Sequence, residues 1–168
     1  MKADETYEIT VQGDRLSFAA AHFLVYGGGQ CEALHGHNYR VTVTVRGALD
    51  RNGLLLDFLL LRDAVASLLA PLDHRTILAG RNEQLALERE EGLVSVRHAG
   101  RCMSFPAEDV VVLPIANTSA EMLAGHLARE LAERLAGEAG GALERIAVEV
   151  EESPGLAGRC VLRPDPAG

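Results

Sequence analysis

Two histidines separated by one glycine, His35 and His37, are spaced so that they could bind one metal ion. In a β-strand, residues i and i+2 point to the same face with Cα atoms ~7 Å apart, so two imidazoles can converge. Both share the parity of the apolar positions in the predicted strand 39–45. His22, at the end of another predicted strand, could be a third ligand, although each histidine could instead be a hydrogen-bonded core residue. A three-histidine site with an open fourth position suits catalytic zinc.

Cys31 stands four residues before His35. It could close the metal site as a fourth ligand, act as a thiolate base whose pKa is lowered by nearby positive charge, or be a buried loop cysteine. The spacing does not separate these three interpretations. Cys102 and Cys160 lie in apolar, strand-like runs and are predicted to be packing residues.

Three acidic or basic side chains elsewhere could take part in the same chemistry. Asp73 and His74 form an adjacent acid–imidazole pair that could polarise a thiol or shuttle a proton, or could instead cap the preceding helix. Glu152 continues the parity of an apolar strand, so its carboxylate is predicted to point inward. There it could accept two N–H donors from a guanidine-like heterocycle, unless the strand end frays into solvent.

Other polar positions give weaker signals. His98 is predicted to lie in a hairpin turn, and His126 to be solvated beside a stripe of leucines. The charged run 88–91 is predicted to be a solvated loop. The glycines at 27–29 lack the strand and helix that surround a nucleotide-binding loop.

Alternation and helix signals predict the elements that would position these residues. Strands are expected over 7–11, 16–22, 39–45, 146–150 and 160–163, a hairpin over 93–105, and helices over 57–70 and from 118 to a stop at Gly140-Gly141. Thr118 to Glu121 reads as a capping box for the second helix. Residues 80–92 are predicted to be a loop. Because helices do not alternate regularly with strands, we expect an α+β fold with an antiparallel sheet and helices on one face.

Composition limits the class of protein. The length of 168 residues suits a single domain, 1–168, and the net charge of −8 argues against nucleic acid as a partner. Neither a membrane-spanning run nor a signal peptide is evident, which predicts a cytoplasmic location. An odd number of widely spaced cysteines argues against a disulfide framework.

Taken together, these motifs resemble the 6-pyruvoyltetrahydropterin synthase and 6-carboxytetrahydropterin synthase family. The resemblance runs from Phe18 to Glu152, and its motifs are ordinary singly but specific in this order. They are Phe18–His22, Cys31-x-x-x-His35-Gly36-His37-Asn38-Tyr39, Gly53 through Asp57-Phe58, Leu72-Asp73-His74, Asn117 to Glu121, and Val150 to Ser153.

The resemblance implies a tunnelling fold, which is a four-stranded antiparallel sheet with two helices on one face, here with an inserted hairpin in the segment 80–112. Subunits of this family form trimers that stack into hexamers, with active sites at subunit interfaces. The roles that it implies are a zinc ion held by His22, His35 and His37, a proton-abstracting thiol at Cys31 assisted by Asp73 and His74, a pterin anchor at Glu152, and Thr118 and Ser119 beside the pterin.

The activity implied first is that of a lyase that converts 7,8-dihydroneopterin triphosphate into 6-carboxytetrahydropterin on the route to queuosine. The spacing from Cys31 to His35 resembles this carboxy type rather than the pyruvoyl type. However, Glu32 resembles the glutamate of members that cleave the side chain to 6-hydroxymethyldihydropterin, as a substrate-contacting residue. The alternatives are therefore that second activity, both activities, a 6-pyruvoyltetrahydropterin synthase, or a non-catalytic zinc- or pterin-binding protein.

Overall fold

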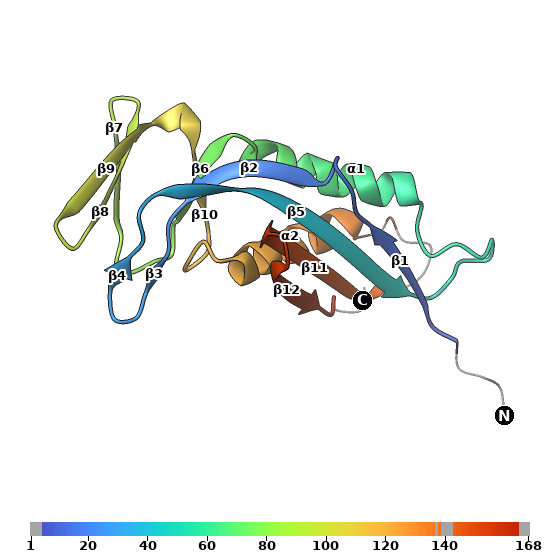
Figure 1. Ribbon diagram of the computed structural model, residues 1–168. Helices are drawn as coiled ribbons and strands as arrows, with labels where there is room; N and C mark the ends of the chain where they lie inside the picture. Colours follow the sequence, from blue (N-terminus) through green and yellow to red (C-terminus); the bar gives the residue numbers. More distant parts are fainter. Residues whose placement is uncertain (1–4, 137, 139–142, 165–168) are drawn as a thin grey trace.

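A strongly curled sheet forms the body of the protein, and both helices cover its inner face (Figure 1). This computed structural model describes residues 5–136, 138 and 143–164. The seven strands of the sheet are β1 (Tyr7–Val11), β2 (Ser17–His22), β5 (His35–Gly47), β6 (Arg75–Ala79), β10 (Val110–Leu113), β11 (Leu143–Ser153) and β12 (Leu156–Leu162). Their order is β10-β6-β2-β5-β11-β12, and β1 also pairs with β5.

The sheet is mixed, so the predicted four-stranded antiparallel sheet is wrong in strand number and direction. β6 pairs in parallel with both β2 and β10, whereas the other pairs are antiparallel. The chain reaches β6 only after crossing the sheet through a helix, which returns it parallel to β2. β6 and β10 were not predicted because they are short, continuous apolar runs without alternation.

The two helices agree closely with the sequence prediction. α1 (Phe58–Leu69) is capped by Asp57, whose carboxylate accepts a hydrogen bond from the Leu59 N–H, and a 3-10 turn follows at Ala70–Leu72. α2 (Ala120–Leu135) is capped by Ser119, so the predicted capping box is displaced by one residue. Its stripe of leucines is buried against the sheet, as expected from the helical spacing. The predicted stop at Gly140-Gly141 lies outside the described residues.

The alternating strands supply the other half of the core. On β5, the buried residues Tyr39, Val41, Val43 and Val45 face the helices, and on β11 Ile146, Val148 and Val150 do the same. These positions are the ones that alternation predicts. Neither helix within the described residues is long and apolar enough to cross a membrane.

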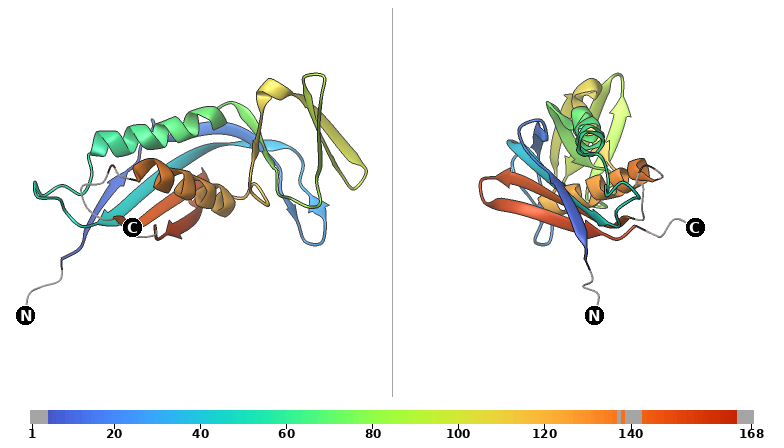
Figure 2. Two further views of the ribbon diagram at one scale, coloured as in Figure 1. Left: turned by 180° about the vertical axis from the view of Figure 1, so that it is seen from behind. Right: turned by 90° about the vertical axis from the view of Figure 1, so that its right-hand side faces the viewer.

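A second, three-stranded antiparallel sheet projects from one end of the body (Figure 2). We call it the insertion; it consists of β7 (Ala86–Glu90), β8 (Leu93–His98) and β9 (Arg101–Pro106). The predicted hairpin is confirmed, but the predicted loop over 80–92 is wrong in part because β7 is a strand whose side chains are mostly exposed and charged. The insertion packs against the small hairpin of β3 (Val25–Tyr26) and β4 (Gln30–Cys31) through a separate apolar cluster.

Candidate metal centre and active site

Three histidines meet on the inner face of the sheet, where β2 and β5 pair. His22 lies directly opposite His35 in the register, and His37 lies opposite Ala20. The ring centroids are 4.6 to 5.2 Å apart, and the candidate ligand atoms of all three rings lie within 4.8 Å of one another. The structure thus brings together the three residues that spacing suggested.

Hydrogen bonds orient two of these rings for metal binding. Nδ1 of His22 lies 3.0 Å from the Thr118 carbonyl oxygen, and Nδ1 of His35 lies 2.9 Å from that of Ala33. Because a carbonyl only accepts, Nδ1 carries the proton in both rings and Nε2 keeps its lone pair. Nε2 of His22 is buried and has no hydrogen-bond partner among the described residues.

Burial also favours the state of His22 that a metal needs. The side chain is 1 % exposed, and burial lowers its pKa to about 4, with the neighbouring His35 and His37 adding to the shift and the Thr118 carbonyl opposing it. His22 is therefore neutral at pH 7. A neutral, buried and otherwise unpartnered imidazole nitrogen is the observation that makes this site fit a metal ion.

Glu32 and Cys31 are placed differently with respect to the histidines. Glu32 Oε2 lies 4.0 Å from His35 Nδ1 and also accepts a hydrogen bond from the Leu24 N–H. Neither Cys31 nor Glu32 belongs to the cluster of potential metal ligands found within the described residues. The Cys31 thiol contacts the Glu32 carbonyl oxygen at 3.4 Å, and the Cys31 side chain packs partly against the apolar cluster beneath the insertion.

Tyr39 lies next to the triad on the inner face of the sheet, and Glu152 lies near Tyr39. The Tyr39 ring stands 5.8 Å from His22 and 5.6 Å from His37, and its buried hydroxyl has no partner among the described residues. Burial raises the pKa of Tyr39, and the carboxylates of Glu152 and Glu32 raise it further. Glu152 is half-buried on the Tyr39 side of β11, which is the inward direction that parity predicted. Tyr39 was not predicted as a site residue, although its parity with His37 was a usable signal.

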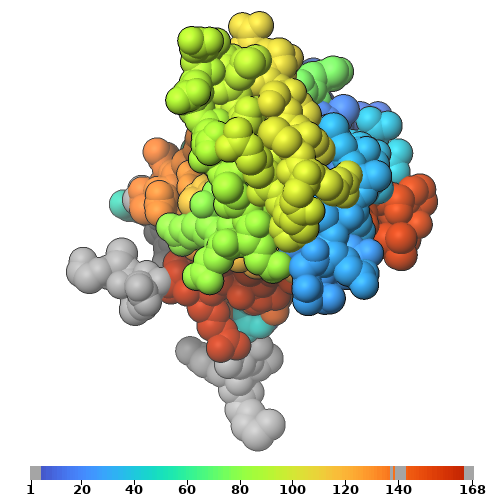
Figure 3. Space-filling view, turned by 90° about the vertical axis from the view of Figure 1, so that its left-hand side faces the viewer, coloured from blue at the N-terminus to red at the C-terminus, as the bar shows by residue number. Residues whose placement is uncertain are grey.

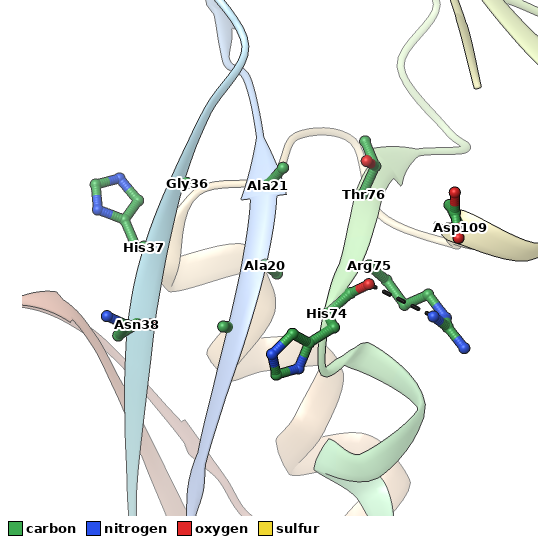
Figure 4. A pocket seen from close by; sticks show the side chains of 10 residues that line it. Ala20, Ala21, Gly36, His37, Asn38, His74, Arg75, Thr76 and Asp109 are labelled. Carbon is green, nitrogen blue, oxygen red and sulfur yellow. Dashed lines mark hydrogen bonds between the residues drawn. The ribbon is translucent and has the colours of Figure 1, made fainter. Parts of the chain in front are cut away.

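Asp73 and His74 lie on the other side of β2. Asp73 accepts a hydrogen bond from the Ala19 N–H at 2.8 Å, which is the main reason that its pKa is lowered, and it contacts His74 Nδ1 at 3.0 Å. The His74 side chain is 80 % exposed. It borders an open cavity of about 600 Å³ over β2, β5 and β6, and Figure 4 shows the His37 ring on the far side of β5 from it. His37 also borders this cavity, but within one chain the rings of His37 and His74 point away from each other.

The remaining candidates have structural partners in this chain. The Thr118 hydroxyl donates to the Phe23 carbonyl, and Ser119 caps α2. Cys102 is exposed and His126 is half-buried with 13 % of its side chain accessible, so the predictions of a packing cysteine and a solvated histidine are wrong. Cys102 lies on the side of β9 opposite to Met103 and Phe105, and His126 lies on α2 beside its buried face. Cys160 packs against the core as predicted.

Fold and site define the class: an α+β protein with a curled mixed sheet and a three-histidine cluster suited to a metal ion. Residues 9–160 match the model of 6-pyruvoyl tetrahydropterin synthase, so the chain belongs to that family. A protein from Methanocaldococcus jannaschii, provisionally named 6-carboxy-5,6,7,8-tetrahydropterin synthase, is 36 % identical over 123 residues, which are 71 % of this chain and 74 % of that one.

Solved structures of the family show the same fold. The 6-pyruvoyl tetrahydropterin synthase of Plasmodium falciparum is 30 % identical and superposes with a TM-score of 0.87, covering 95 % of this chain and 99 % of that one. A variant of the Plasmodium vivax enzyme, in which a catalytic glutamate is replaced, is 28 % identical with a TM-score of 0.86 and the same coverage.

Proposed function

We propose that this protein is a zinc-dependent lyase that converts 7,8-dihydroneopterin triphosphate and water into 6-carboxy-5,6,7,8-tetrahydropterin, with acetaldehyde and triphosphate as the other products. The unpartnered, buried Nε2 of His22 within the triad is the observation that carries this proposal. The provisional name of the Methanocaldococcus jannaschii relative supports the carboxy product.

In this proposal His22, His35 and His37 would hold the zinc ion. When bound, the ion would act as a Lewis acid on the substrate side chain. The Thr118 and Ala33 carbonyls keep two of the rings in the tautomer that offers Nε2. Cys31 removes a proton from the substrate side chain. Glu152 accepts N–H donors of the pterin ring, with Thr118 and Ser119 beside it.

The placement of Asp73 and His74 supports a site shared between copies of the chain. The His74 side chain is mostly exposed and points away from the His37 ring (Figure 4), so we expect it to assist Cys31 of a neighbouring subunit rather than Cys31 of its own chain. A homo-oligomer, a trimer or a stacked hexamer, would supply that neighbour and would also pair the free edges of the sheet.

Glu32 supports a second candidate, the cleavage of the side chain to 6-hydroxymethyl-7,8-dihydropterin. Its carboxylate lies 4.0 Å from His35, although neither Glu32 nor Cys31 belongs to the cluster of potential metal ligands among the described residues. The Plasmodium vivax relative also uses a catalytic glutamate. A carboxylate beside the metal site could act as the base in place of the thiol.

Product analysis separates the two candidates. Zinc-loaded protein is incubated with 7,8-dihydroneopterin triphosphate, and the pterins are identified by mass spectrometry. We expect 6-carboxytetrahydropterin, lost in Cys31→Ala with zinc retained. A hydroxymethyl product that survives Cys31→Ala and disappears in Glu32→Ala would overturn the first proposal in favour of the second.

A further inference from the structure

The turn of the insertion reaches the backbone on either side of Cys31. β8 and β9 are joined by Ala99 and Gly100, both with positive φ, so that His98 and Arg101 face each other across the end of the hairpin. Both side chains lie on the inner face of the insertion, in line with Val94, Val96, Met103 and Phe105. This geometry delivers two cationic groups to one stretch of backbone.

Arg101 holds the chain at Cys31 and Glu32. Its Nη1 donates to the Cys31 carbonyl at 3.2 Å and to the Glu32 carbonyl at 3.3 Å. These two carbonyls belong to the residues whose side chains are the candidate bases. A charged donor shared by two adjacent carbonyls restrains the two peptide planes that flank Glu32, and with them the directions in which the side chains of Cys31 and Glu32 leave the backbone.

His98 holds the loop that precedes Cys31. Its Nε2 lies 2.7 Å from the Gly29 carbonyl oxygen and its Nδ1 lies 2.9 Å from that of Gln84. Two carbonyl acceptors require two N–H donors, which only the imidazolium supplies. The hydrogen bonds with Gln84 and Gly29 raise the pKa of His98, whereas the Arg101 guanidinium opposes the shift. Figure 3 shows the insertion lying against the early chain segment that contains this loop.

We propose that His98 and Arg101 are positioning residues of the active site, which clamp the backbone of residues 29–32 so that Cys31 and Glu32 are held in a fixed relation to the histidine triad. This inference rests on the proposed function for its catalytic consequence. The clamp itself is a property of the free protein.

The test compares two arginines of the same hairpin. Arg101→Met removes the clamp, whereas Arg97→Met removes an equal charge from the outer face, where Arg97 pairs with Glu88. In metal-free protein, we expect amide hydrogen exchange over residues 29–33 and alkylation of Cys31 to accelerate about tenfold in Arg101→Met. Neither rate should change in Arg97→Met, and Arg101→Lys should restore part of the protection.

Turnover gives a second readout. In the zinc-loaded enzyme, Arg101→Met and His98→Gln should lower kcat about tenfold while KM and zinc content stay close to those of the parent, because a misaligned base affects the reaction more than binding. Unchanged exchange and alkylation in Arg101→Met, or an equal kcat loss in Arg97→Met, would overturn the proposal. The exchange and alkylation readouts decide the clamp even if the protein converts no pterin.

Discussion

His22 couples the protonation of one buried ring to the stability of the metal-free protein. Its pKa is lowered to about 4 in the folded chain, from ~6.5 in the unfolded chain. The unfolded state therefore binds the extra proton first as pH falls, and stability is lost between about pH 6.5 and pH 4. We expect a contribution of about 2 kcal/mol to disappear between pH 7.5 and pH 5.

Urea unfolding of EDTA-treated protein at the two pH values measures this loss. His22→Gln cannot titrate, so its stability should fall by about 2 kcal/mol less over the same interval. An equal loss of stability in the parent protein and in His22→Gln would show that the titration of His22 does not cause the loss.

Asp73 orients His74 and has no contact with the triad of its own chain. Asp73→Asn removes the carboxylate that holds His74 Nδ1, so we expect kcat on 7,8-dihydroneopterin triphosphate to fall about 10²-fold, with zinc content unchanged. Asp63→Asn, which alters an exposed pair with Arg62 on α1, is the control and should keep full activity. A loss of zinc in Asp73→Asn would contradict the separation of the pair from the metal site.

The first turn of α2 lies beside the candidate metal centre. Ser119 caps the helix, and the carbonyl of the preceding Thr118 orients His22. Ser119→Ala should cost about 1 kcal/mol in the free energy of unfolding and weaken zinc binding, because fraying of the first turn displaces that carbonyl. Asp57→Ala removes the cap of α1 at a similar cost but should leave zinc affinity unchanged.

Denaturant unfolding and a competitive chelator titration measure the two quantities. Zinc affinity that falls equally in both variants would mean that global stability alone governs binding.

Most helices and strands could be predicted, because alternation of apolar and polar residues indicates half-buried strands and N-cap residues such as Asp57 and Ser119 indicate where helices begin. Alternation over 39–45 is enough to assign His35 and His37 to the face that carries the apolar side chains of β5. β6 could not be predicted because its five-residue run has no period, and its parallel pairing decides where Asp73 and His74 lie. For the same reason the sequence predicted which residues form the triad but not that the pair faces away from it. The contacts of His98 and Arg101 depend on tertiary packing of the insertion and leave no local signal.

At the scale of the whole molecule, the triad and the Asp73–His74 pair of one chain point away from each other (Figure 4). We therefore expect two inactive variants to restore activity to each other in mixed oligomers. In the proposed function, His22→Ala removes a zinc ligand and His74→Ala removes the assisting imidazole, so we expect each to be inactive alone. Mixed oligomers from equal co-expression should regain about one quarter of wild-type activity, since a random interface joins an intact triad to an intact His74 at about that frequency. Activity of tagged, co-purified oligomers measures this, and mixtures as inactive as their parents would place a complete site within one chain.

The ligand set of the metal is the most direct test of the central claim. X-ray absorption at the zinc edge of the reconstituted protein reports the number and type of coordinating atoms. We expect three imidazole nitrogens at ~2.0–2.1 Å and one further light atom, with the same set of ligands in Cys31→Ala. A sulfur ligand at ~2.3 Å, or a spectrum without imidazole scattering, would contradict it.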